Sequence, residues 1–292
     1  AARYFPKTTW SRLRATPALL AEKVESYFAR LPSRPADEAY ATAVLRTRRQ
    51  FVYGTRTPVL HINDVIREFQ HPDRSPGLPY TKQGYKRKDE VDPNVYKQYA
   101  HNLKYGVYNK CTTPCNAVGK SMVGPRGKCR LIWVYPAHMT FIEGMFAMPL
   151  IRKYQMNQGR YAIWVSYARG HLRTIMSKRP RNYRWLGLDF KSYDSRVPAW
   201  LIRDAFAILR DTLDFTQYQY HGRPTDSDTL PRLWKELVRY FINTPIKFPS
   251  GYVRVKHQGI PSGSFFTNLI GSICLSIAME YMLNGVPYLS QA

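Results

Sequence analysis

The chain has 292 residues, and its 44 Lys and Arg residues against 20 Asp and Glu residues give a formal net charge of +24. Its hydrophobic fraction of 44% is ordinary for a globular protein and excludes a disordered basic tail. A positive excess of this size repels itself unless an anion neutralises it. The charge favours nucleic acid as the partner, and it leaves open nucleoside triphosphates, an anionic membrane surface or a merely soluble basic surface.

The cysteines and the strongest apolar run argue against a disulfide-built fold and a membrane span. Four cysteines are too few for a disulfide framework at this length. Cys111 and Cys115 follow His101, but a zinc site would need a second pair at ligand spacing, so we expect free thiols in a reducing compartment. The apolar run over residues 265–283 contains Glu280 and several hydroxyl groups that would be costly in lipid. We therefore expect a buried helix there and no membrane partner.

In chain order, the sequence first predicts two helices and an irregular region. Apolar residues at helical spacing predict a helix over residues 18–28, and a second helix is expected over 37–49. Residues 51–110 are rich in Pro, Gly and Tyr, which predicts irregular structure with a rigid loop at 71–79.

The remaining sequence predicts strands and helices in a mixed order. The expected elements are a strand at 130–135, a helix at about 139–155, a buried strand at 183–187, a helix with Pro198 in its first turn, a β-hairpin over 245–255 and a long helix after residue 264. Strands and helices do not alternate regularly, and no internal repeat is present, so the pattern favours an α+β fold.

The run over residues 188–194 is the first stretch that could carry chemistry. Asp189 ends the predicted strand, and Asp194 lies in the turn that leaves it. Two carboxylates placed in this way suit a hard cation held beside a substrate hydroxyl. The alternative is that Asp194 or Ser195 only caps the helix that follows.

A basic, glycine-punctuated stretch over residues 118–135 is the second. It is not a Walker phosphate loop, because Met122 and Cys129 stand where that pattern needs Gly and Ser or Thr. If its last part is a strand, Lys128 and Arg130 point the same way and could grip a triphosphate. A solvated basic edge strand explains the segment equally well. The cations of this stretch are Lys120, Arg126, Lys128 and Arg130.

Residues 259–264 form the third stretch, a glycine-hinged loop that leads into an apolar helix. Backbone N–H groups at such a helix start favour a phosphate or a template backbone. An ordinary helix cap supplied by Ser262 or Ser264 is the alternative.

Together these stretches resemble the RNA-dependent RNA polymerases of RNA viruses, most closely those of partitivirus-like double-stranded RNA viruses. Residues 189–194 are similar to polymerase motif A, 259–268 to motif B, 127–132 to the end of motif F, and 75–79 to motif G. The resemblance covers roughly residues 70–283. It implies a right-hand polymerase fold, of which the chain would contain the fingers and the first part of the palm.

The resemblance also implies a chemistry, in which the primer 3′-hydroxyl attacks the α-phosphate of a nucleoside triphosphate with two Mg²⁺ ions, or Mn²⁺, as cofactors. Asp189 would be catalytic and would ligate the metal, and Asp194 would be catalytic through a hydrogen bond from the ribose 2′-hydroxyl. Nucleotide binding would fall to Lys120, Arg126, Lys128, Arg130, Ser262, Gly263, Thr267 and Asn268, and the RNA template path to Ser75, Pro76 and Gly77.

Two departures from the family pattern stand out. Many relatives carry Asn four residues after the motif B threonine, where this chain has Gly271. Asn268 could substitute for it, but Asn268 is one position after Thr267, and one helical position is a rotation of about 100°, so its side chain need not face the site. The sequence contains no Gly-Asp-Asp, the signature of motif C. We therefore expect a fragment, with residues 1–182 as the N-terminal region and fingers and 183–292 as a partial palm with an intervening fingers segment. Such a fragment is expected to be inactive alone.

The implied partners are an RNA template and product, nucleoside triphosphates and a viral capsid protein, and the implied location is the host cytoplasm inside the virus particle. Two alternatives are a non-catalytic RNA-binding or capsid-associated protein and a reverse transcriptase. The first explains the charge but not the order of the motifs. The second usually places a bulky aromatic where the sugar is checked, whereas this chain has Asp194.

Overall fold

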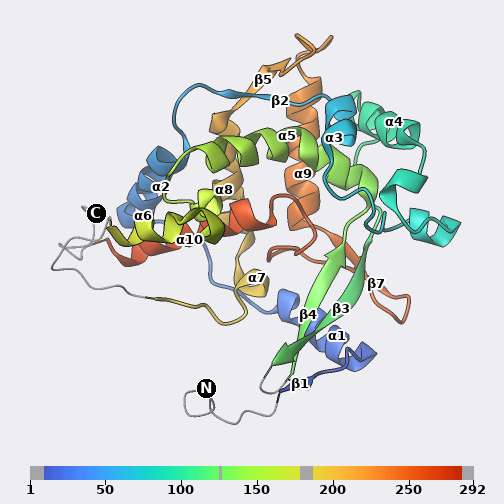
Figure 1. The fold of residues 1–292 in the computed structure, drawn as a ribbon, viewed down its shortest axis with the longest axis horizontal. Coiled ribbons are helices and arrows are strands. Elements are labelled where there is room, and N and C mark those ends of the chain that lie inside the picture. The colour runs from blue at the N-terminus through green and yellow to red at the C-terminus, as the bar shows by residue number, and fades with distance from the viewer. Residues whose placement is uncertain (1–9, 125–126, 178–186, 285–292) are drawn as a thin grey trace.

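The computed structural model describes residues 10–124, 127–177 and 187–284 (Figure 1). It combines helices and strands in an α+β arrangement, with a helical body from which a β-hairpin projects. The helices are α1 (Pro17–Glu25), α2 (Glu38–Phe51), α3 (Ile62–Glu68), α4 (Pro93–Lys104), α5 (Ala137–Met156), α6 (His171–Ser177), α7 (Tyr193–Arg196), α8 (Ala199–Thr212), α9 (Thr229–Ile242) and α10 (Thr267–Met282). The strands are β1 (Ser11–Arg12), β2 (Thr57–Val59), β3 (Cys115–Gly124), β4 (Lys128–Val134), β5 (Leu213–Tyr218), β6 (Pro245–Lys247) and β7 (Val253–Val255).

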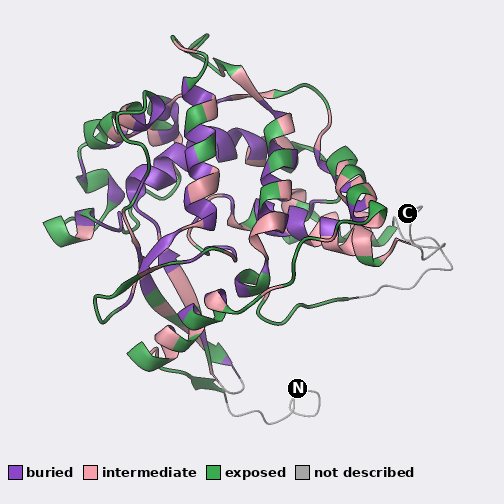
Figure 2. Cartoon of the chain, turned by 180° about the vertical axis from the view of Figure 1, so that it is seen from behind, coloured by how far each residue is buried: buried purple, intermediate pink, exposed green. Residues whose placement is uncertain are grey.

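Helix α5 lies at the centre of the helical body and is buried along most of its length (Figures 1 and 2). It packs against α3, α4 and α9, which cover it on different sides. A helix that is apolar all round needs such a complete cover, because it has no face suited to water. None of the helices in the described ranges is long and apolar enough to cross a membrane.

The main sheet is built around the β3–β4 hairpin. Strand β3 pairs antiparallel with β4 and places Lys120 opposite Arg130. At its start β3 also pairs in parallel with β6, which in turn pairs antiparallel with β7. The hairpin is therefore fixed at its base to the body, and its tip is paired with β1.

Most of the predicted elements are confirmed. The helices expected at 18–28, 37–49 and 139–155 correspond to α1 with the short 3₁₀ turn after it, α2 and α5, and the hairpin over 245–255 corresponds to β6 and β7. The strand predicted at 183–187 lies almost wholly outside the described residues. Its last residue and the three that follow, through Phe190, form neither helix nor strand.

The prediction of irregular structure over residues 51–110 was wrong, because this region contains β2, α3 and α4. Helix α4 has a complete start signal: the Asp92 carboxylate accepts a hydrogen bond from the Asn94 amide at 2.9 Å, and Pro93 occupies the first turn. The helix then buries Tyr96 and Leu103 against the core. Pro93, one of the prolines behind the prediction of irregular structure, therefore lies at the start of a helix.

Candidate active site

Strand β4 carries a basic face at one end and an apolar face behind it. Lys128 and Arg130 are exposed, whereas the intervening Cys129 is buried, so the strand alternation places both cations on one side as predicted. Lys120 is the directly opposed partner of Arg130 on β3 and shares that side. Arg126 lies outside the described residues.

Residues 259–266, here named the glycine loop, are docked on the other end of β4. The Ser262 hydroxyl donates to the Leu131 carbonyl at 3.1 Å and accepts from the Trp133 amide at 3.2 Å. A Cβ at Gly263 would lie 1.8 Å from the Trp133 carbonyl oxygen, so no side chain fits there. The loop thus depends on a serine and a glycine at these two positions to approach the strand.

A buried carboxylate lies under the glycine loop. Both oxygens of Glu143, on α5, accept from the Ser264 hydroxyl, at 2.8 and 2.9 Å, and one also accepts from the Phe265 amide at 2.8 Å. No described cation pairs with Glu143, and burial raises its pKa to about 8. Thr267 begins α10 and donates its hydroxyl to the Pro261 and Ser264 carbonyls.

Residues 189–196, here named the aspartate turn, are tied to the glycine loop through backbone groups. Ser192 has φ of 56°, a left-handed conformation that turns the chain into α7. The Ile260 amide donates to the Asp194 carbonyl at 2.6 Å. The Tyr193 hydroxyl donates to the Gly271 carbonyl at 2.7 Å, so α7 is also held against α10.

The two predicted catalytic carboxylates differ in their surroundings. Burial raises the pKa of Asp194, and the nearby Arg130 guanidinium lowers it in part, which places the aspartate turn beside the basic face of β4. Asp189 is exposed, and no described residue forms a hydrogen bond or ion pair with its side chain. Among the described residues, no group of three or more His, Cys, Asp or Glu could hold a metal ion.

Residues 71–79, here named the proline loop, meet the glycine loop across a cavity of about 410 Å³. Ser75 and Gly263 both line it, together with Ile132 of β4. The Ala137 amide donates to the Pro76 carbonyl at 2.8 Å, which attaches the proline loop to the start of α5.

Gly77 allows a further close approach in the proline loop. Its φ of 66° and a Cβ position 2.5 Å from the Tyr135 carbonyl oxygen exclude a larger residue. The structure therefore brings together three predicted segments that are distant in sequence: the proline loop, β4 and the glycine loop.

Asn268 is engaged away from this cavity. Its side-chain oxygen accepts from the Tyr161 hydroxyl at 2.8 Å, and Tyr161 follows α5 in the chain. Gly271 instead faces the aspartate turn, since a Cβ there would lie 3.7 Å from the Tyr193 ring.

The sequence analysis missed two buried ionisable residues that hold the glycine loop. One is Glu143, whose signal was a single acidic residue in an otherwise apolar helical run. The other is Lys256, whose ammonium donates to the Phe241, Ile242 and Gly259 carbonyls at 2.5 to 3.0 Å. It caps the end of α9 and fixes the start of the loop, and a lone lysine after a hairpin gave no signal of that.

The fold is that of one half of solved right-hand polymerases. The RNA-dependent RNA polymerase of a human picobirnavirus superposes with a TM-score of 0.64 at 15% identity, over 91% of this chain and 50% of that one. Its insertion-loop deletion mutant gives a TM-score of 0.63 at 14% identity, over 88% of this chain and 49% of that one.

The family described as viral RNA-dependent RNA polymerase matches residues 20–288, and the chain belongs to it. The RNA-directed RNA polymerase of Cryptosporidium parvum virus 1 (strain KSU-1) is 30% identical over 255 residues, which are 85% of this chain and 46% of that protein. The chain thus spans about half the length of the relatives that it matches.

Proposed function

We propose that this chain provides the fingers and the first part of the palm of an RNA-directed RNA polymerase, residues 1–182 and 183–292 respectively. The observation that carries the proposal is the meeting of three segments: the basic face of β4, the aspartate turn beside it and the glycine loop attached to both. A capsid-lining protein would need the charge but would not need these attachments.

The basic face would hold the incoming triphosphate. Arg130 offers a planar guanidinium for two phosphate oxygens, and Lys128 and Lys120 add point charges on the same side of the hairpin. Arg130 also acts on Asp194 and keeps that carboxylate closer to its ionised form. Asp194 is then able to accept a hydrogen bond from a ribose 2′-hydroxyl, which deoxynucleotides lack.

The Asp189 carboxylate would hold Mg²⁺, or Mn²⁺, since it is exposed and no described side chain occupies it. Such an ion, when bound, would polarise the phosphate and support the attacking and leaving oxygens. Asp189 alone supplies fewer ligands than such an ion needs, so further oxygen ligands, among them phosphate oxygens and water, would complete its shell.

The template strand would pass between the proline loop and the glycine loop. Ser75 lines the 410 Å³ cavity, Pro76 and Gly77 follow it in the proline loop, and Arg74 and Lys88 add cations to the same lining. Across the cavity Gly263 forms part of the lining, and Ser262 and Thr267 hold the glycine loop in position to contact the nascent base pair. Asn268, bonded to Tyr161, would support the helix behind the loop.

Binding of ATP and 2′-deoxyATP in the presence of Mg²⁺ tests the proposal. Arg130→Gln should weaken both about tenfold, the worth of one charge-assisted phosphate contact. Asp194→Ala should leave the affinity for 2′-deoxyATP unchanged and lower the affinity for ATP to the same value. Asp194→Asn should keep part of the difference in affinity between the two nucleotides. The exposed Lys82→Gln variant is the control. Equal binding of the two nucleotides by the unmodified chain would refute the role of Asp194.

RNA template and product, nucleoside triphosphates and a capsid protein are the partners we propose, inside a virus particle in the host cytoplasm. Similarity to a polymerase of a double-stranded RNA virus supports this location. Particles purified on a density gradient should contain the polymerase together with capsid protein and genomic RNA. Recovery of the polymerase only in particle-free fractions would contradict it.

A further inference from the structure

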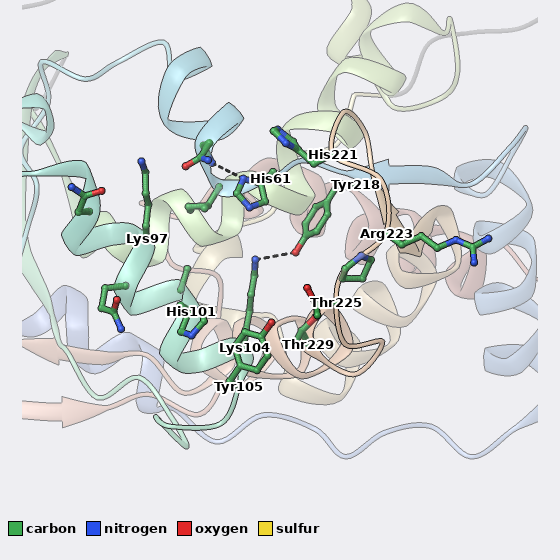
Figure 3. A pocket seen from close by; sticks show the side chains of 16 residues that line it. His61, Lys97, His101, Lys104, Tyr105, Tyr218, His221, Arg223, Thr225 and Thr229 are labelled. Atoms are coloured by element: carbon green, nitrogen blue, oxygen red, sulfur yellow. Dashed lines mark hydrogen bonds between the residues drawn. The ribbon is translucent and has the colours of Figure 1, made fainter.

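A second cavity, of about 640 Å³, lies between α3, α4 and the segment that connects β5 to α9 (Figure 3). It shares no lining residue with the cavity between the proline and glycine loops. The elements that line it, α3, α4 and the segment after β5, lie at the end of the body that carries β2 and β5, away from α7 and the β-hairpin tip (Figure 1). The polymerase site leaves this cavity without a function.

One wall of the cavity is a polar face of α4. Lys97, His101 and Lys104 follow one another at spacings of four and three residues, so they share a side of the helix. Tyr218, the last residue of β5, and Arg223, on the segment that follows it, line the opposite wall. In Figure 3 the Tyr218 hydroxyl faces Lys104, whereas the Arg223 side chain extends away from the two lysines.

The cavity is lined by cations without a matching anion. Lys97, Lys104 and Arg223 contribute to the lining, and none of its described lining residues is Asp or Glu. Lys104 is only 8% exposed, and its ammonium donates to the Tyr218 hydroxyl at 3.0 Å. No described carboxylate lies within ion-pair distance of it. A buried cation without a counter-charge is costly, and a bound anion would remove that cost.

His61 reports the sign of the potential in the cavity. Burial lowers its pKa to about 4, and Lys104, His221 and Lys97 push it in the same direction. Asp64 acts in the opposite sense, but its carboxylate is taken up by Arg67 at 2.7 Å and by the His221 ring at 2.8 Å. After burial, the largest influence on His61 is therefore a cation of the lining, Lys104, which agrees with a negative ligand.

We propose that this cavity binds the phosphate of a nucleotide, either free or at the end of an RNA strand. Lys97 and Lys104 on α4 would contact the phosphate oxygens, and the exposed Arg223 side chain would turn toward them from the opposite wall. The rings of Tyr105 and Tyr218 would flank a base, as aromatic side chains do in single-strand recognition. The volume is in the range of sites for ligands of this size. No residue of the polymerase site takes part.

Hydrogen–deuterium exchange of the whole chain locates such a ligand. The probes are ATP and two RNA octamers of one sequence, one with a 5′-triphosphate and one with a 5′-hydroxyl. We expect slower exchange in peptides covering 93–104 and 218–229. The Lys97→Gln/Lys104→Met double variant should abolish this protection and weaken binding there about tenfold or more. Lys82→Gln should change nothing.

The probes distinguish a free nucleotide from an RNA end, and Arg130→Gln distinguishes this cavity from the polymerase site. Protection by ATP identifies a free nucleotide as the ligand, and protection only by the 5′-triphosphate RNA identifies a strand end. Arg130→Gln should reduce protection of β3 and β4 while leaving 93–104 unchanged, so failure of the polymerase proposal is seen independently. Exposed Arg223→Gln repeats the test without altering a buried side chain. The proposal is overturned if none of the probes slows exchange in these peptides. It is also overturned if the protection persists in both the lysine double variant and Arg223→Gln.

Discussion

The buried Glu143 makes the stability of this protein depend on pH in an unusual direction. Its pKa rises from 4.5 in the unfolded chain to about 8 in the folded one, because burial disfavours the charged form. Between these values the folded protein keeps a proton that the unfolded chain has released. The stability that this group contributes is therefore fully present below pH 4.5 and is lost as the pH rises to about 8.

The change of the unfolding free energy with pH follows from the one proton that Glu143 keeps in the folded protein. One proton difference corresponds to about 1.4 kcal/mol per pH unit, so about 2 to 3 kcal/mol is lost between pH 5.5 and 7.5. Glu143→Gln removes the titration but keeps an oxygen that accepts from the Phe265 amide. The variant should thus gain stability relative to the unmodified chain as the pH rises.

Urea unfolding at a series of pH values measures this directly. The difference in unfolding free energy between Glu143→Gln and the unmodified chain isolates the group, because all other titrations are common to both proteins. Ser264→Ala removes a hydrogen bond but leaves the carboxyl, so it should retain the slope. A difference that stays constant between pH 5.5 and 7.5 would show that Glu143 is already ionised in the folded protein, and the reasoning would fail.

Two further predictions concern the attachment of the glycine loop. Gly263→Ala places a methyl group against the Trp133 carbonyl, so we expect a loss of about 3 kcal/mol or more in the free energy of unfolding, measured by thermal unfolding, and weaker ATP binding. Gly159→Ala is the control, because a Cβ at Gly159 meets no other atom. Equal effects of the two substitutions would refute the packing argument. Lys256→Met leaves three carbonyl groups without their donor and should cost at least about 2 kcal/mol in urea unfolding, together with faster amide exchange at the end of α9. A variant as stable as the unmodified chain would show that the buried cation costs as much as its hydrogen bonds return.

The sequence predicted those parts of the site that depend on local pattern. Alternation placed Lys128 and Arg130 on one face of a strand, and β4 has that face. The helix after the aspartate turn and the helix after the glycine loop also have local signals. These are Pro198 for the first and Ser262 and Ser264 for the second. Periodicity and turn residues act over a few positions, and they carry this information without tertiary contacts.

The attachments between segments could not be predicted in the same way. Ser262 was expected to cap a helix or bind nucleotide, but its partners are backbone groups of β4, 129 and 131 residues away. A hydroxyl can bond any exposed backbone group, so its sequence neighbours do not identify the partner. The same holds for Glu143, because an acidic residue in an apolar helix indicates a buried partner without saying which loop provides it.

The glycine loop is held by small sets of hydrogen bonds to four different parts of the structure rather than by one extensive interface. Ser262 bonds β4, Ser264 bonds α5, Ile260 bonds the aspartate turn, and Lys256 bonds the end of α9. Each such bond is worth about 1 kcal/mol net, so one of them can break without unfolding the element on either side. Loss of one of these bonds should therefore leave the others in place, including the link between Ile260 and Asp194. Because that link joins backbone groups, a movement of the aspartate turn would be passed directly to the loop that lines the 410 Å³ cavity.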